Sequence, residues 1–192
     1  MKRIGFALCG SFCCFEKAFC AMEKLVASGY QVTPIFSFAS QTCNTRFGSP
    51  DRHLLRAEMI CGCPPVCKLE EAERFGPEKS FDLMVVAPCT ASTCRRLADG
   101  LYDTPVSLGV KAHLRNGRPV LLAICTNDAL SLSAPTIGRL LPLKNFFFVP
   151  MVQDDPENKP TSAVADFSLL PAAVSAALEG KQLRPLFLLP KV

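Results

Sequence analysis

Four small residues, Thr90-Ala91-Ser92-Thr93, form the segment of the chain best suited to chemistry. They follow a short apolar run, residues 81–87, that has the composition of a buried parallel strand. Pro88 is expected to stop strand pairing, and a helix is expected to begin at Cys94, so hydroxyl and free backbone N–H groups gather in the loop. Such a loop suits a phosphate or the edge of a flavin. The alternative is that its hydroxyls only cap the next helix.

Strand and helix patterns alternate along the whole chain. Strands are expected at 4–9, 31–38, 82–87, 119–124 and 145–149, and helices at 14–28, 53–60, 69–74, 94–100, 105–116, 135–141 and 168–179. This alternation predicts an α/β fold with a mainly parallel sheet, formed by one domain over residues 1–192.

Polar residues recur where the expected strands end. Gly10-Ser11, Ser37-Phe38-Ala39-Ser40, Thr90 to Thr93 and Thr126-Asn127-Asp128 all occupy such positions. In a parallel sheet these positions share one edge, and ligands bind there at a topological switch point. The first loop lacks the Gly-x-Gly-x-x-Gly fingerprint of dinucleotide binding, so we do not expect NAD in that mode; a single Gly-Ser turn fits a monophosphate better.

Composition and charge narrow the class of protein. The net charge of +4 is modest, and the basic residues are scattered along the chain. This argues against nucleic-acid and membrane partners and suits small anionic substrates. No apolar stretch approaches the roughly 18 residues that a spanning helix needs, so we expect a soluble, cytoplasmic protein.

The eleven cysteines and two histidines are expected to be structural or solvated. Most of the thiols fall in apolar or helical runs and are expected to be reduced core residues. Cys61, Cys63 and Cys67 form the one candidate metal cluster, but no second pair of ligands completes a tetrahedral set, so no metal is expected. His53 and His113 lie in charged helical segments and are expected to face solvent.

Two motifs carry a resemblance to a known family. Pro88-Cys89-Thr90-Ala91-Ser92-Thr93, with Leu97-Ala98-Asp99-Gly100 and Asp103, resembles the Pro-x-Ser-Ala-Asn-Thr and Ala-Asn-Gly-x-x-Asp motif of the flavoprotein family, which includes the cysteine decarboxylases and phosphopantothenoylcysteine decarboxylase. Gly10-Ser11 matches that family's phosphate turn. Ser92 and Asp99 stand where the family has asparagines.

The resemblance implies a cofactor and an assembly. It implies a Rossmann-like three-layer sandwich, the flavoprotein fold, and FMN bound by Gly10, Ser11, Ser37, Thr90, Ala91, Ser92 and Thr93. It also implies a homo-oligomer. The decarboxylases place a histidine about a dozen residues before the motif proline; residues 71–75 contain none, so cysteine decarboxylation is not expected.

A closer match lies in the branch of the family that takes part in forming dipicolinate in spore-forming bacteria; it rests on residues 2–6, 44–48, 115–120, 126–130, 144–150 and 153–156. This match implies the conversion of a dihydrodipicolinate-type precursor together with a dehydrogenase-like subunit that brings NAD(P). The alternatives are a noncatalytic, flavin-free partner subunit and a flavin-dependent decarboxylase.

The same resemblance points to substrate-contacting residues. A dicarboxylate needs cations, and Arg46, beside Asn44, is the first candidate, with a surface salt bridge as the alternative. Asn127 and Asp128 match the family's substrate loop, where Asp128 would serve as a general base or instead cap the next turn. The polar segment 153–160 is expected to be a flexible lid or subunit contact.

Overall fold

A seven-stranded sheet forms the centre of the computed structural model, which describes residues 1–189. The strands are β1 (Arg3–Leu8), β2 (Gln31–Phe36), β3 (Leu83–Cys89), β4 (Val120–Thr126), β5 (Phe146–Phe148), β6 (Met151–Val152) and β7 (Ala163–Ala165). Their order is β2-β1-β3-β4-β7-β6, and β5 also pairs with β4. Strands β1 to β5 pair in parallel, whereas β7 pairs antiparallel with both β4 and β6. The expected α/β fold with a mainly parallel sheet is therefore confirmed.

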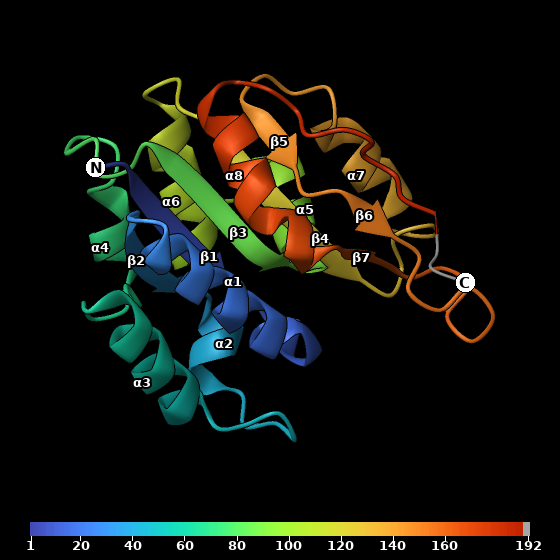
Figure 1. Cartoon of the computed structure of the whole chain (residues 1–192), viewed down its shortest axis with the longest axis horizontal. Helices are drawn as coiled ribbons and strands as arrows, with labels where there is room; N and C mark the ends of the chain where they lie inside the picture. Colours follow the sequence, from blue (N-terminus) through green and yellow to red (C-terminus); the bar gives the residue numbers. More distant parts are fainter. Residues whose placement is uncertain (190–192) are drawn as a thin grey trace.

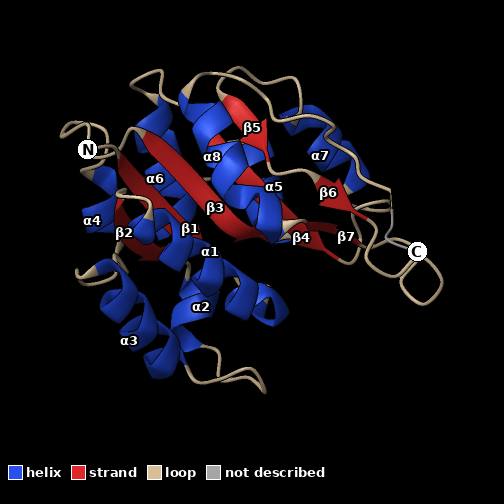
Figure 2. Ribbon diagram, viewed as in Figure 1, coloured by secondary structure: helices blue, strands red, loops and turns tan. Residues whose placement is uncertain are grey.

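Helices cover both faces of the sheet (Figures 1 and 2). The α-helices are α1 (Phe15–Ala27), α2 (Phe38–Thr42), α3 (Pro50–Cys61), α4 (Leu69–Glu73), α5 (Ala91–Asp99), α6 (Pro105–Leu114), α7 (Ala134–Leu140) and α8 (Leu170–Leu178), with short 3-10 turns at Phe12–Cys14 and Phe167–Leu169. One apolar core joins the sheet to α1, α3 and α8, and a second joins it to α4, α5, α6 and α7. The result is a three-layer sandwich.

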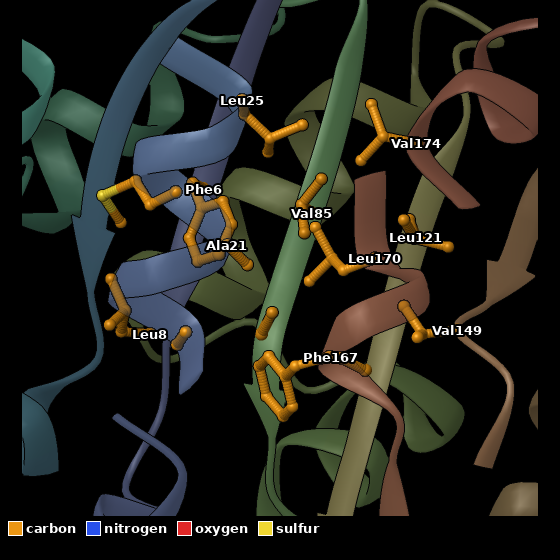
Figure 3. Packing of buried hydrophobic residues seen from close by; sticks show 14 of the residues in the cluster. Phe6, Leu8, Ala21, Leu25, Val85, Leu121, Val149, Phe167, Leu170 and Val174 are labelled. Atoms are coloured by element: carbon orange, nitrogen blue, oxygen red, sulfur yellow. The ribbon is translucent and has the colours of Figure 1, made fainter. Parts of the chain in front are cut away.

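Buried strands explain why the sheet needs cover on both sides. All seven residues of β3 are buried, as are the first six of β4, so each strand is apolar on both faces. On one face Leu25 of α1 and Leu170 and Val174 of α8 pack near Val85 and Leu121 of the sheet (Figure 3). In the sequence, residues 82–87 and 119–124 are mostly apolar at consecutive positions and do not alternate with polar residues, which is the pattern typical of strands buried on both faces.

The connections place one switch point beside β1. The chain crosses from β1 to β2 on one side and returns to β3 on the other, so the loops after β1 and β3 leave the sheet at adjacent positions. In open parallel sheets this is where ligands bind. Gly10-Ser11 and Thr90 lie at the start of those two loops.

Several details of the secondary structure differ from the sequence-based expectations. The strand expected at 31–38 ends at Phe36, because Ser37 caps the short helix α2, which was not expected. Pro88 does not end strand β3, because pairing to β4 resumes at Cys89 after a register shift. Helix α5 begins at Ala91, and not at Cys94, because Thr90 caps it. The polar loop expected at residues 153–160 lies between two short strands, β6 and β7, which form a hairpin that was not expected.

Both histidines are buried, so the expectation of solvent exposure is wrong. His53 packs edge-on against Phe15, with ring centroids 4.8 Å apart, and burial lowers its pKa. His113 is bonded through Nε2 to the Pro119 carbonyl at 2.9 Å, and burial lowers its pKa to about 4. The charged residues that suggested solvent exposure lie beside them in the sequence and on other helix faces.

All eleven cysteines are free thiols, and five of them are buried. Two members of the suspected metal cluster face different partners: the Cys61 thiol points to Met22 Sδ, at 3.3 Å, and the Cys63 thiol to the Val32 carbonyl, at 3.6 Å. Across residues 1–189 no group of three or more His, Cys, Asp or Glu side chains is arranged to hold a metal ion. No helix in that range has the length and apolar character needed to cross a membrane.

Candidate functional site

A pocket of about 540 Å³ lies at the carboxyl edge of the sheet, where the loops after β1, β3 and β4 meet. Its size falls within the roughly 300–1,000 Å³ typical of small-molecule sites. It is lined by Gly10, Ser11, Phe12, Cys13, Cys14, Thr45, Arg46, Phe47, Thr90, Ala91, Ser92, Cys125, Thr126, Asn127, Asp154, Lys159, Ser162 and Val164. The structure therefore brings together most of the expected site residues, from the three strand-end loops and from the segment that carries Arg46.

The first turn of α5 forms one wall of this pocket. Thr90 is the N-cap, and its Oγ1 accepts the Thr93 N–H at 3.4 Å. The backbone N–H groups of Ala91 and Ser92 lie in the first turn, where the helix offers no carbonyl to accept them. The positive end of the helix dipole also lies here. The Ser92 hydroxyl, 3.3 Å from Thr90 Oγ1, adds a donor. This wall can bind an anion such as a phosphate.

The turn after β1 forms another wall of the pocket. Ser11 donates its hydroxyl hydrogen to the Cys125 carbonyl at the end of β4, at 3.0 Å, which joins the two strand ends. Its backbone N–H donates to the Cys9 carbonyl at 2.7 Å. Gly10 has no left-handed conformation, and an added Cβ would meet Ala39 Cβ at 3.4 Å, an ordinary contact. Gly10 thus contributes backbone atoms to the pocket lining, and its backbone conformation does not require glycine.

Charged residues stand at the rim. The Arg46 guanidinium lies over the Phe47 ring, 4.9 Å from its centroid, and makes no ion pair to a described carboxylate. Lys159 pairs with Asp154 at 3.2 Å. Although burial alone would raise it, hydrogen bonds from Ser162 and Lys159 lower the pKa of the Asp154 carboxyl. Among the described residues, the rim therefore presents one guanidinium without an ion pair and one neutralised pair.

Sequence reasoning missed Asp154, Lys159 and Ser162 as pocket residues. They reach the pocket because β7 pairs with the end of β4 and carries the β6–β7 loop with it. The signal in the sequence was weak: two short apolar runs, residues 151–152 and 163–165, flank the polar segment. The loop expected as a lid or subunit contact thus borders the pocket.

Four expected site residues lie outside the pocket lining. Ser37 caps α2 and shares a hydrogen bond with Ser40, at 3.0 Å between hydroxyl oxygens. Thr93 is buried beneath Thr90, and Asn44 lies exposed next to the pocket residue Thr45. Asp128 accepts hydrogen bonds from Thr126 and Ser133 hydroxyls, at 2.5 and 2.8 Å. Through these two hydroxyls the Asp128 carboxylate stabilises the turn that follows β4.

Asp99 and Asp103, at the end of the family motif, lie outside the pocket lining. Asp99 pairs with Arg139 of α7 at 2.6 Å and with Arg95 of its own helix. Asp103 pairs with Arg96 at 2.8 Å. These ion pairs connect the C-terminal end of α5 to α7 and to the segment that follows α5. The second half of the motif therefore stabilises the helix whose first turn lines the pocket.

Comparison with known proteins agrees with this architecture. The flavoprotein family model matches residues 1–165. The chain belongs to the flavoprotein family. Within this family, the B subunit of dipicolinate synthase from Bacillus subtilis strain 168 is 43% identical over 185 residues, which cover 96% of this chain and 92% of that protein. The resemblance seen in the sequence is confirmed.

Solved flavoprotein structures match the fold closely. The B subunit of dipicolinate synthase from Bacillus halodurans superposes with a TM-score of 0.90 at 40% identity, covering 99% of this chain and 97% of that chain. The FMN-dependent cysteine decarboxylase SpaF gives a TM-score of 0.71 at 18% identity, covering 93% and 96%. The second likeness concerns the fold alone.

Proposed function

We propose that this chain is a subunit of dipicolinate synthase, which forms pyridine-2,6-dicarboxylate from a dihydrodipicolinate-type precursor during sporulation. The observation that carries the proposal is 43% identity to the B subunit of dipicolinate synthase over 96% of the chain, with a pocket where the fold places ligands. We infer a cytoplasmic location in a spore-forming bacterium. The reaction removes two hydrogens from the ring, so an oxidant must accept two electrons.

FMN fits the pocket as a cofactor. The first turn of α5, with the hydroxyls of Thr90 and Ser92, would hold the phosphate, and the Ser11 turn would close the other side. Phe12, Phe47 and Val164 supply the apolar surface that a flavin ring needs. When bound, FMN supplies two-electron redox chemistry. Ser37 and Thr93, outside the lining, would act by supporting the neighbouring loops.

The substrate would enter at the charged rim. A guanidinium binds both oxygens of a carboxylate at once, and Arg46 makes no ion pair among the described residues. Because Asp154 neutralises Lys159, Arg46 would be the main cation that attracts a dianionic substrate. Asn127, which lines the pocket, would donate to the substrate, and Asp128 would hold the turn that presents Asn127.

The chain is expected to work with other subunits. The absence of the dinucleotide fingerprint after β1 supports a division of labour in which the dehydrogenase-like A subunit of dipicolinate synthase brings NAD(P). The relatives are named as one subunit of a larger enzyme, which agrees with such a partner. We also propose that copies of this chain form a homo-oligomer.

A second candidate function is a noncatalytic, flavin-free partner that stabilises the dehydrogenase-like subunit. Ser92 and Asp99 favour it, because both replace family asparagines and Asp99 is engaged in ion pairs. A stand-alone flavin-dependent decarboxylase is disfavoured, since neither His53 nor His113 lines the pocket.

One reconstitution experiment separates the two candidates. The dehydrogenase-like subunit, NAD(P) and the precursor are incubated with this chain, either freed of flavin or loaded with FMN, and dipicolinate is quantified. The proposed function predicts that the FMN-loaded protein raises the yield well above the flavin-free protein. Equal yields from both preparations would favour the noncatalytic partner, and no dependence on this chain would refute both.

A further inference from the structure

The turn that carries Arg46 to the pocket rim is closed by its own hydrogen bonds, and we call it the Arg46 turn (residues 45–48). Thr45 and Gly48 exchange two backbone hydrogen bonds, at 3.2 and 3.1 Å, so Arg46 and Phe47 occupy the two central positions. The Thr45 hydroxyl accepts the Phe47 N–H at 3.2 Å and donates to the Gly48 carbonyl at 3.4 Å. Within residues 1–189, every hydrogen bond of the Arg46 turn joins two of its own residues, so packing must fix its place on the protein.

His53 of α3 lies against one end of this turn. A Cβ added at Gly48 would stand 2.8 Å from His53 Cε1 and 3.0 Å from its Nε2, so the edge of the ring faces the Gly48 backbone. The ring also packs on Phe15 and Phe19 of α1, with centroid distances of 4.8 and 5.9 Å. The Arg46 turn therefore rests on a ring that α3 carries and α1 holds in place.

The His53 ring has a nitrogen without a partner. The residue is 4% exposed, and its Nε2 is buried with no hydrogen-bond partner among the described residues. A buried polar group without a partner costs free energy, and an apolar side chain would avoid that cost. Burial also lowers the pKa of His53, so the ring is neutral at neutral pH. Stability alone does not explain a histidine here, and its contact with the Arg46 turn points to a role in the site.

We propose that His53 is a positioning residue for substrate binding, because it holds the Arg46 turn where the guanidinium reaches a carboxylate in the pocket. This inference rests on the proposed function, since it takes Arg46 as the group that binds one carboxylate of the dicarboxylate. Arg46 and Phe47 line the pocket and His53 does not, so His53 acts only through the turn. A displaced turn would weaken the contact to one carboxylate and leave the other substrate contacts unchanged.

The test compares two ligands that differ by one carboxylate. The full chain, with excess FMN, is titrated calorimetrically with pyridine-2,6-dicarboxylate, the product of the proposed reaction, and with pyridine-2-carboxylate. The preference is the ratio of the two dissociation constants. We expect the wild type to prefer the dicarboxylate by about tenfold or more, and Arg46→Gln to lose most of that preference. His53→Ala should reduce the preference at least about threefold, and combining it with Arg46→Gln should cause no further loss, because both changes act on one contact.

A matched control and a second variant accompany this test. His113→Gln changes another buried histidine, on α6 and outside the pocket lining, and should keep the wild-type preference. Gly48→Ala perturbs the same contact from the turn, since its Cβ would meet the His53 ring, and should lower the preference as His53→Ala does. If circular dichroism shows that His53→Ala does not fold, the result for Gly48→Ala decides.

The possible failures are distinguishable. Equal weakening of both ligands by His53→Ala would show a role in folding alone and overturn the inference, as would an unchanged preference. In both cases, loss of the preference in Arg46→Gln would leave the proposed function standing. A wild type without preference for the dicarboxylate, or a preference that Arg46→Gln retains, would refute the Arg46 contact itself and this inference with it.

Discussion

Acid pH is expected to destabilise the fold through His113. This side chain is 1% exposed on α6, and its Nε2 is bonded to the Pro119 carbonyl at 2.9 Å. Burial, helped by the positive charge of Arg118, lowers its pKa from 6.5 to about 4. The hydrogen bond to Pro119 and the negative charge of Asp82 oppose this shift. The folded protein therefore holds His113 neutral at a pH where the unfolded chain already binds the proton.

The size of the effect follows from the two pKa values. Between pH 6.5 and about 4 the unfolded state binds more protons, so the free energy of unfolding falls as the pH falls. The stabilisation is fully present above pH 6.5 and is lost progressively down to about pH 4. At about 1.4 kcal/mol per pH unit, the loss attributable to His113 is roughly 3 kcal/mol.

Urea unfolding of the wild type and His113→Gln at several pH values between 7 and 4 measures this effect. Glutamine keeps an N–H donor for Pro119 but does not titrate, so the stability difference between the two proteins should shift by roughly 3 kcal/mol across the range. The pKa of His53 is also lowered, but His53 is present in both proteins and cancels in the difference. Parallel stability curves would refute the reasoning.

Three further predictions concern packing, the Asp128 turn and the Cys14 thiol. Gly5→Ala would place Cβ 2.8 Å from the Phe81 ring and should cost roughly 1–3 kcal/mol in urea unfolding, whereas Gly10→Ala should cost little; equal costs would contradict this. Asp128→Ala should lower the melting temperature yet leave FMN affinity in a fluorescence titration unchanged, and a large affinity loss would restore a direct role. Alkylation of Cys14 by iodoacetamide, followed by mass spectrometry, should reach half its maximal rate near pH 7, since its pKa is about 7; a midpoint above 8 would contradict it.

Much of the fold was predictable because its signals are local. Continuous apolar runs identified β3 and β4, and glycine punctuation identified the end of α1. The start of α5 was misplaced because Ser and Thr serve equally well in a loop and as a cap, and only the Thr90–Thr93 bond decides between them. The hairpin β6–β7 has strands of two and three residues, too short for any period to appear.

The candidate site was predictable only in part. Because parallel strands share a carboxyl edge, the sequence alone is enough to bring Ser11, Thr90 and Asn127 together, and all three line the pocket. Lys159 and its neighbours reach the pocket through antiparallel pairing of β7 with β4, a long-range contact that no local pattern encodes. The burial of His53 likewise depends on packing against α1, which charged sequence neighbours concealed.

The most direct test of the central claim is the visible spectrum of the protein, alone and co-purified with the dehydrogenase-like subunit, after incubation with FMN and desalting. Ser92 lines the pocket, so Ser92→Trp should fill it, and Ser175→Trp on α8, exposed and outside the lining, is the matched control. The account predicts a retained flavin band in the wild type and in Ser175→Trp and its loss in Ser92→Trp. A colourless wild type in both preparations, or equal retention by Ser92→Trp, would contradict it.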